Sequence, residues 1–234
     1  MHKDGEIDTR SIYTCLAVAR ILNILTPGNY CLLVYIHEMT LECNFLIYFF
    51  HTELCEGVAD YVLTCQTYEG GFGGEPFNEA HGGYNFCALA ALLILGHGGS
   101  CDVEGQKRWL QRMQTQLEGG FRGRTNKLVD ACYSFWQGGA FAVLRLIEMG
   151  MNDCADCAPG VEQNLPHLQD VDMNSAALQK YIIHCAQQPE GGLRGNIVGI
   201  TNYLDVKILL IFLTFALLQT NLEKDAISII VVML

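Results

Sequence analysis

The sequence Glu118-Gly-Gly-Phe-Arg-Gly-Arg-Thr-Asn-Lys-Leu-Val-Asp-Ala-Cys-Tyr-Ser-Phe-Trp136 joins a glycine-rich stretch to the start of an apolar segment. The glycines permit a tight turn, because glycine adopts backbone conformations that other residues avoid. The apolar residues that follow recur at helical spacing, which predicts a buried helix with Asp130 as its N-cap. We therefore expect the cations of the turn to lie beside the N-terminus of a helix.

Three cations, Arg122, Arg124 and Lys127, lie within this turn. Backbone N–H groups, the positive end of a helix dipole and nearby cations together suit an anionic group such as a diphosphate. The chain carries a net charge of −11, so the cationic turn is a local exception. The alternative is that these side chains form an ordinary solvated face.

The same turn also offers two donor atoms to a metal. Asp130 supplies a carboxylate oxygen and Cys132 a thiolate, a mixture that zinc accepts. Residues two positions apart in the sequence do not share a face of a regular helix, so the pair can bind one ion only at a helix start. A two-ligand fragment is a weak signal, and the alternative is that Asp130 caps the helix while Cys132 is a small buried hydrophobe.

Composition excludes several classes of protein. A length of 234 residues, with 50% hydrophobic and 17% charged residues, predicts a globular protein with a large core. The negative charge argues against a surface for nucleic acid. Eleven cysteines without framework spacing, and a polar N-terminus in place of a signal peptide, predict reduced thiols and a cytoplasmic location. The pair Cys154-x-x-Cys157 has the spacing of a zinc or redox site, but an acidic loop explains it equally well.

Internal repeats predict the fold. The three related segments are Cys65-Gln-Thr-Tyr-Glu-Gly-Gly-Phe-Gly-Gly, Met113-Gln-Thr-Gln-Leu-Glu-Gly-Gly-Phe-Arg-Gly and Cys185-Ala-Gln-Gln-Pro-Glu-Gly-Gly-Leu-Arg-Gly. Each predicts a helix that ends in a Glu-Gly-Gly turn, followed by a short loop and a second, apolar helix. Repeated helical hairpins close into a solenoid or a toroid. The predicted fold class is therefore all-α.

Polar and aromatic residues recur at matching positions of the repeats. Counted from the glutamates, the matching pairs are His81 and Asp130, Tyr84 and Tyr133, and Cys87 and Trp136. The opening segment fits the end of an earlier unit, because Arg10 precedes Tyr13 as His81 precedes Tyr84. The helix starts of successive units line one rim of such a fold, so Arg10, His81 and Asp130 are expected to meet there.

We assign residues 1–195 to a partial toroid that contains an aberrant insertion at 28–52 and a loop at 150–175. Residues 196–234 form a tail outside the repeats, and its segment 206–218 is either a buried helix or a strand. Neither 28–52 nor the tail has an uninterrupted apolar run of about 20 residues, so no membrane span is expected.

Residues 65–87 and 113–136 resemble the β subunits of protein farnesyltransferases, a group within the protein prenyltransferases. The motifs are the first two repeat segments quoted above, Glu79-Ala-His-Gly-Gly-Tyr-Asn-Phe-Cys87, and the stretch from Gly120 to Gln137. The resemblance covers Asp8–Pro27 and Glu53–Arg194. It implies an α/α barrel, a toroid of helical hairpins, in agreement with the repeats.

The resemblance also implies roles for individual residues. The diphosphate of farnesyl diphosphate, with Mg²⁺ accompanying it, would be held by His81, Arg124, Lys127 and Tyr133. The isoprenoid pocket would be lined by Arg10, Tyr13, Tyr84, Cys87 and Trp136. Asp130 and Cys132 would be two of three protein ligands to a catalytic zinc. The family's zinc binds the cysteine thiolate of a C-terminal CaaX protein, which displaces the diphosphate in a heterodimer with an α subunit.

The sequence departs from the family in ways that bear on activity. The family's third zinc ligand is a histidine in an Asp-x-Tyr-His-x-Cys motif after the third turn, and no histidine follows Gly195 here. The chain is expected to start partway through the barrel, and removing 28–52 would restore family spacing. Our hypothesis is that 28–52 and 196–234 are translated intron or an incorrect gene model, and that the chain is a truncated or mis-spliced form.

Three other functions stay open from the sequence. The β subunit of type I geranylgeranyltransferase is a close alternative, although that enzyme more often has proline where this chain has Thr125 and Leu128. A non-catalytic α-toroid that only binds an α subunit or a prenyl ligand is a second. A barrel of the terpene-cyclase type is a third, but the sequence lacks its Asp-x-Asp-Asp motif.

Overall fold

The computed structural model describes residues 7–21, 55–150, 173–189 and 192–193. The helices in this part of the chain are α1 (Thr9–Ile21), α4 (Val58–Thr64), α5 (Gly82–Ile94), α6 (Val103–Met113), α7 (Tyr133–Glu148) and α8 (Ser175–Tyr181), with a 3₁₀ turn at Gly98–Ser100 and a π turn at Ile182–Ala186. These ranges contain no β-strand, which confirms the all-α prediction. None of their helices is long and apolar enough to cross a membrane.

Several predicted segments lie outside the described residues. These are the insertion at 28–52, most of the loop at 150–175, the Cys154–Cys157 pair and the tail at 196–234. Their assignments stay predictions. Within the described ranges the seven cysteines form no disulfide.

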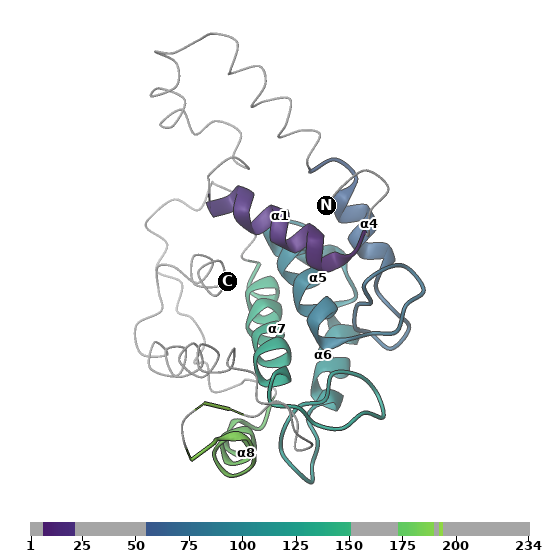
Figure 1. Ribbon diagram of the computed structural model, residues 1–234. Helices are drawn as coiled ribbons and strands as arrows, with labels where there is room; N and C mark the ends of the chain where they lie inside the picture. The colour runs from purple at the N-terminus through teal and green to yellow at the C-terminus, as the bar shows by residue number, and fades with distance from the viewer. Residues whose placement is uncertain (1–6, 22–54, 151–172, 190–191, 194–234) are drawn as a thin grey trace, which may run out of the picture.

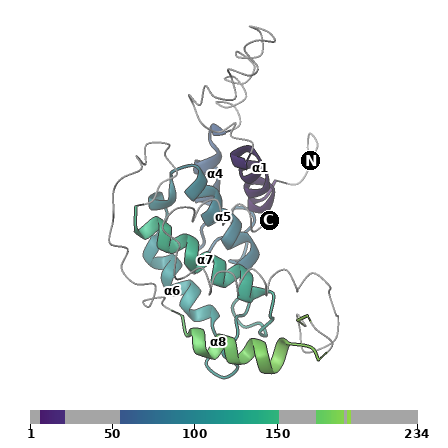
Figure 2. The ribbon, with the colours of Figure 1, turned by 90° about the vertical axis from the view of Figure 1, so that its left-hand side faces the viewer.

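Helix α5 lies at the centre of the described part and packs between α1 and α7 (Figure 1). Every residue of α5 except Tyr84 is buried, because the helix is apolar nearly all round and both of its sides are covered. Helix α4 packs against α5, and α6 packs against α7, with α8 near the lower end of α6 (Figure 2). The chain thus alternates between central helices (α1, α5, α7) and flanking helices (α4, α6, α8).

The three repeat turns share one backbone contact. Each closes with an antiparallel bridge between the glutamine and the apolar residue on either side of the glycines: Gln66 with Phe72, Gln114 with Phe121, and Gln187 with Leu193. The middle turn does so with one extra residue before its glutamate. This shared geometry confirms the repeats predicted from the sequence.

Glutamine side chains attach each of the first two turns to the flanking helix that follows it. The Gln66 amide donates to the carbonyl oxygens of Gly70 (2.9 Å) and Asp102 (3.1 Å), and its Oε1 accepts from the Asp102 N–H (2.9 Å). Gln114 makes the same three bonds with Gly119 and Asn174, at 2.9, 2.9 and 2.8 Å. Asp102 and Asn174 are the N-caps of α6 and α8, so each turn is bonded to the start of a helix.

The Glu-Gly-Gly motif is explained by close packing on the same flanking helices. Gly70 has φ +106°, and a β-carbon there would lie 2.2 Å from the Gly105 carbonyl oxygen. Gly119 has φ +78°, and its β-carbon would lie 2.7 Å from the Ala177 carbonyl oxygen. Only glycine combines a left-handed backbone with so close an approach.

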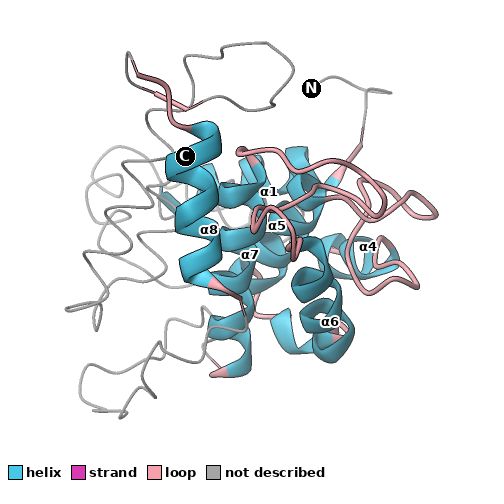
Figure 3. Cartoon of the chain, turned by 90° about the horizontal axis from the view of Figure 1, so that it is seen from below, coloured by secondary structure: helices cyan, strands magenta, loops and turns pink. Residues whose placement is uncertain are grey.

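The central helices begin along one rim. The Thr9 N–H at the start of α1 donates to the Gly74 carbonyl oxygen (3.1 Å), and the Gly82 N–H at the start of α5 donates to the Gly123 carbonyl oxygen (2.9 Å). The loop after each of the first two glycine turns is therefore bonded to the start of the preceding central helix. Figure 3 shows these connecting loops, seen from below, on the side that faces the viewer.

The predicted N-cap role of Asp130 is wrong, because α7 begins at Tyr133 with Cys132 as its N-cap residue and no capping side chain. Asp130 instead accepts the Cys132 N–H through Oδ1 (2.9 Å). The Tyr133 N–H donates to the Asp130 carbonyl oxygen (3.1 Å), which makes a tight turn before the α-helix. Such i to i+3 turns are common at helix ends, and apolar spacing alone does not separate them from the helix.

Candidate functional site at the helix starts

His81 and Tyr133, which come from two successive repeats, meet at the predicted rim. His81 is the N-cap of α5, and its Nδ1 accepts the Gly83 N–H (3.2 Å). Its Nε2 lies 3.0 Å from the Tyr133 hydroxyl oxygen at the start of α7. Because Nδ1 is an acceptor, the proton of the neutral ring resides on Nε2, which donates to the tyrosine oxygen. The hydroxyl proton of Tyr133 is then left to donate to another group.

Both side chains keep this arrangement at neutral pH. The pKa of His81 is lowered by burial and by the charges of Arg124 and Arg10, which outweigh the opposing effect of Glu79. Burial raises the pKa of Tyr133 to about 12, with further contributions from Cys132 and Asp130. The imidazole therefore stays neutral and the phenol stays protonated. The pair can bind an anion through the hydroxyl group without either member changing its charge.

Arg10 joins this group from α1. Its guanidinium carbon lies 4.9 Å from the centre of the Tyr84 ring, and the His81 and Tyr84 rings are 5.4 Å apart. Arg10 is held by the Asp8 carboxylate, which accepts from Nε (3.1 Å) and also from Nη2. Burial acts to raise the pKa of Asp8, but the hydrogen bonds from Arg10 and Ser11 lower it below the usual range.

Sequence analysis did not identify Asp8 as a site residue. Asp8 is almost fully buried and also accepts the backbone N–H groups of Arg10 (2.8 Å) and Ser11 (3.1 Å). An aspartate just before a helix, with an arginine two residues later, was the available signal.

Arg124 and Lys127 lie on the loop of the second repeat. Arg124 Nη1 forms an ion pair with Glu79 Oε2 at 3.0 Å, and its side chain is 41% exposed. The pair is therefore open to solvent, and an anionic ligand can compete for the guanidinium. Lys127 is exposed, and among the described residues no hydrogen bond or ion pair engages its ammonium group. The structure thus brings Arg124 to the site, whereas Lys127 points to solvent from the same loop. Glu79 is a second residue that sequence analysis missed.

Aromatic side chains line the interior below the polar group. Tyr13 is 2% exposed, and its ring packs edge-on against Phe86 at 5.6 Å. Phe86 also contacts Trp136 at 5.7 Å, and Trp136 contacts Phe135 at 5.0 Å. The sequence predicted Tyr13 and Trp136 for this region but missed Phe86, which joins them. An apolar residue in an apolar helix gives no sign that distinguishes it from the core.

Two buried polar groups belong to the same region. Burial and the nearby Asp8 charge raise the pKa of Cys87 to about 12, so its thiol stays protonated. The Tyr13 hydroxyl has no hydrogen-bond partner among the described residues. A buried donor without a partner costs about 1–3 kcal/mol, so a polar atom of a ligand at this place would lower the free energy.

Asp130 and Cys132 are residue types that bind zinc, but together they supply two protein ligands and not the three of a catalytic zinc site. They lie on one tight turn, where one Asp130 carboxylate oxygen accepts the Cys132 N–H at 2.9 Å. No group of three or more His, Cys, Asp and Glu side chains suited to a metal exists within the described residues. A catalytic zinc takes three protein ligands, so a third would have to come from outside the described ranges.

The paired polar rim, the aromatic interior and the hairpin repeats agree with one protein family. The family model of the prenyltransferase alpha-alpha toroid domain matches residues 1–217. The chain belongs to this family. Its match covers the three repeat turns as well as the site described above.

Several curated relatives that match most of this chain are protein farnesyltransferase subunits. The protein farnesyltransferase subunit beta of Pisum sativum is 36% identical over 83% of this chain and 50% of its own length. That of Pyricularia oryzae is 37% identical over 83% of this chain and 35% of its own length. The geranylgeranyl transferase type-1 subunit beta of Arabidopsis thaliana is 42% identical, over 39% of this chain.

A solved structure has the same fold. The Candida albicans protein geranylgeranyltransferase-I complexed with GGPP aligns with a TM-score of 0.60 over 95% of this chain and 51% of that chain, at 21% identity. This likeness confirms the toroid of helical hairpins. The chain spans about half the length of the proteins that it matches, or less.

Proposed function

We propose that this chain acts as the β subunit of a protein farnesyltransferase. In this role it binds farnesyl diphosphate and, with an α subunit, transfers the farnesyl group to the cysteine of C-terminal CaaX proteins in the cytoplasm. The farnesyltransferase relatives cover more of this chain than the type-1 geranylgeranyl relatives do, which supports the farnesyl assignment.

The observation that carries this proposal is the contact between His81 and Tyr133 beside Arg10 and Arg124. A neutral imidazole fixes the phenol, whose proton then points to the diphosphate oxygens as the leaving group gains charge. Arg124 exchanges Glu79 for the diphosphate, and Lys127 turns in from the same loop. Donors placed where charge develops lower the barrier of a displacement, because they need no reorganisation at the moment of reaction. Mg²⁺ would accompany the diphosphate.

The aromatic interior suits the isoprenoid chain. Tyr13, Phe86 and Trp136 form a continuous cluster of aromatic rings, and Tyr84 and Cys87 lie on the same helix as Phe86. Binding an apolar chain there removes its surface from water, with a gain of about 25 cal/mol per Å². The diphosphate at the rim then fixes the depth to which the chain enters.

Asp130 and Cys132 would hold zinc at the start of α7. When bound, zinc lowers the pKa of the substrate thiol, so that the cysteine reacts as a thiolate. The Asp130 carboxylate keeps the Cys132 backbone in place through its hydrogen bond to the N–H, which fixes the spacing of the two donors.

Two alternatives remain under this proposal. The 42% identity to a type-1 geranylgeranyl transferase subunit, over part of the chain, favours a longer isoprenoid as the second candidate. The two-donor metal site favours a non-catalytic toroid that binds an α subunit or a prenyl ligand without transfer. The length of the isoprenoid that binds more tightly distinguishes the first alternative from the proposal. The zinc content of the chain distinguishes the second.

Isothermal titration of the chain with farnesyl diphosphate tests the proposal. We expect Arg124→Ala and Lys127→Ala each to weaken binding by roughly 1.5–3 kcal/mol, the scale of a hydrogen bond to a charged group. Arg145→Ala, on the far part of α7, is the matched control and should leave binding unchanged. Equal affinity of the two variants and the wild type would contradict the anion site. Tighter binding of geranylgeranyl diphosphate would favour the type I alternative.

Zinc analysis of the dialysed chain tests the metal site. Two ligands hold zinc poorly, so residues 1–234 are expected to retain less than one zinc per chain and to transfer little farnesyl, even with an α subunit. Cys132→Ser should reduce the retained zinc further. If the chain kept one zinc per molecule and farnesylated a CaaX peptide, another residue would serve as the third ligand.

A further inference from the structure

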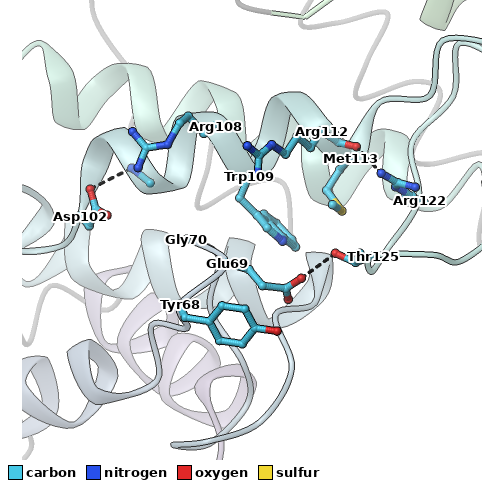
Figure 4. Close-up of a pocket in the computed structure, with 11 residues that line it drawn as sticks. Tyr68, Glu69, Gly70, Asp102, Arg108, Trp109, Arg112, Met113, Arg122 and Thr125 are labelled. Atoms are coloured by element: carbon cyan, nitrogen blue, oxygen red, sulfur yellow. Dashed lines mark hydrogen bonds between the residues drawn. The ribbon is translucent and has the colours of Figure 1, made fainter.

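A separate cavity of about 330 Å³ lies between the first glycine turn and α6 (Figure 4). The residues that give it its chemistry are Tyr68, Arg108, Trp109, Arg112, Arg122 and Thr125. His81, Arg124 and Tyr133 are not among its lining residues. The cavity is thus distinct from the proposed diphosphate site, although both use the loop of the second repeat.

Three arginines gather along one edge of this cavity. Arg108 and Arg112 lie one helical turn apart on α6, where two like charges destabilise a helix. Arg122 is bonded to the end of α6 from the following loop, because its Nη2 donates to the Arg112 backbone carbonyl oxygen at 2.8 Å. Figure 4 shows the three guanidinium groups along the α6 side of the hollow. Arg108 and Arg112 are exposed, so an anion can approach their guanidinium groups from solvent.

The two carboxylates of the cavity do not neutralise these arginines. Asp102 accepts the Gly105 N–H at 2.8 Å, and Glu69 accepts the Thr125 hydroxyl at 2.7 Å. Within the described part of the chain neither carboxylate forms an ion pair with an arginine of the cavity. Three guanidinium groups therefore share one hollow in a chain whose net charge is −11.

Two buried donors in the cavity wall lack an acceptor. Trp109 is 1% exposed, and neither its indole N–H nor the Nε–H of Arg122 has a hydrogen-bond partner among the described residues. Figure 4 shows the indole nitrogen on the side of the ring that faces Glu69 and Thr125. A buried donor left without an acceptor costs about 1–3 kcal/mol. A ligand with several acceptor oxygens would satisfy both donors.

We propose that this cavity binds a phosphate monoester. A phosphate dianion matches the guanidinium fork, carries enough oxygens for several donors and offsets the excess positive charge. The volume exceeds that of a phosphate group alone, so it also admits a small ring or alkyl group beside Trp109 and Tyr68. This inference does not rest on the proposed farnesyl transfer.

Tryptophan fluorescence of full-length Trp136→Phe tests the proposal. The chain has two tryptophans, so this variant leaves Trp109 in the cavity wall as the single reporter. Phenyl phosphate should change the emission in a saturable way, with a Kd of about 1 mM or tighter, and inorganic phosphate should bind more weakly. Sodium chloride at the same ionic strength should give no saturable change.

Variants of the arginines decide the outcome. Arg112→Ala should raise the Kd roughly tenfold or more, and Arg112→Lys, which keeps the charge but not the fork, should fall between it and the parent. Arg145→Ala is the matched control, because it removes an arginine from α7 outside the cavity. Calorimetric titration of the chain with Trp136 intact gives the same comparison if Trp136→Phe folds poorly. An absence of saturable binding, or equal Kd values for Arg112→Ala and Arg145→Ala, would overturn the proposal.

Discussion

The turn that follows Glu69 and the turn that follows Glu118 are built on the same hydrogen bonds, yet they carry different chemistry. At equal distances from these glutamates, the first loop has Glu75 where the second has Arg124. The positions that agree are those where the backbone packs against a flanking helix, as at Gly70 and Gly119. The positions that differ are on the exposed part of the loop. The same backbone form therefore carries an acidic residue in the first loop and a cationic residue in the second.

The shared form extends to an unusual backbone conformation. Phe77 and Asn126 occupy the same repeat position, and both have positive φ angles, 71° and 60°. Asparagine tolerates this region, whereas a large aromatic residue rarely adopts it. The loop geometry is thus set by the turn and its anchors and not by the residue at this position.

The largest effect is expected when a glycine of the common framework gains a side chain. Gly70→Ala places a β-carbon 2.2 Å from a backbone oxygen at a left-handed position, so the free energy of unfolding should fall by about 3 kcal/mol or more. Gly119→Ala, with a 2.7 Å approach, should cost somewhat less. Gly99→Ala is the control, because nothing lies within 4 Å of its β-carbon. Urea denaturation measures all three, and equal stability of Gly70→Ala and Gly99→Ala would contradict a shared framework.

A smaller loss of stability is expected when the glutamine of a repeat turn is replaced by alanine. Gln66→Ala and Gln114→Ala each remove one hydrogen bond within the turn and two to the next flanking helix, which corresponds to a loss of about 2 kcal/mol. The exposed Gln111→Ala on α6 should change stability little. Denaturation curves that separate Gln66→Ala strongly from Gln114→Ala would mean that the two turns are not equivalent.

A pH-dependent effect is expected from His81, which stands where the second repeat has Asp130. The pKa of His81 in the folded chain lies below the usual 6.5. Between pH 6.5 and that lower pKa, His81 is protonated more in the unfolded chain than in the folded chain. Stability should therefore fall as the pH is lowered from 6.5 towards the folded pKa. His81→Gln should lose less stability over this range than the wild type, as measured by urea denaturation at several pH values. Parallel pH profiles would show that His81 is protonated equally in both states.

The smallest effect is expected at the position with positive φ. Phe77 is fully exposed, so Phe77→Asn removes no packing and relieves an unfavourable backbone conformation. Thermal denaturation should show a gain of about 0.5–1 kcal/mol. The reciprocal change, Asn126→Phe, should destabilise by a similar amount. A loss of stability in Phe77→Asn would mean that the aromatic ring has a function in the folded chain.

The sequence predicted the repeats and the helical hairpins, because these depend on glycine spacing and on periodic positions. The repeat positions predicted that Arg10, His81 and Asp130 meet, whereas the residue that contacts His81 is Tyr133, which the family resemblance indicated.

The sequence did not identify Asp8 or Glu79, which orient Arg10 and Arg124. Both are charged residues in loops, and the sequence alone does not show which distant cation such a residue will meet.

The start of α7 was predicted two to three residues too early for a related reason. The apolar pattern continues through the tight turn at Asp130, so periodicity does not mark where i to i+4 bonds begin. The cavity beside α6 was also missed. Arg108 and Arg112 belong to a charged helix face in the sequence, and only the folded loop brings Arg122 to them.

The glutamine hydrogen bonds of the first two repeat turns can form only in a fixed order while the chain is synthesised. Gln66 can complete its hydrogen bonds only after Asp102 has been made, and Gln114 only after Asn174. During translation each of these two glycine turns can therefore complete its hydrogen bonds only after the flanking helix of the next unit has left the ribosome. The first turn is therefore bonded to its flanking helix before the second. The rim then forms from its N-terminal side.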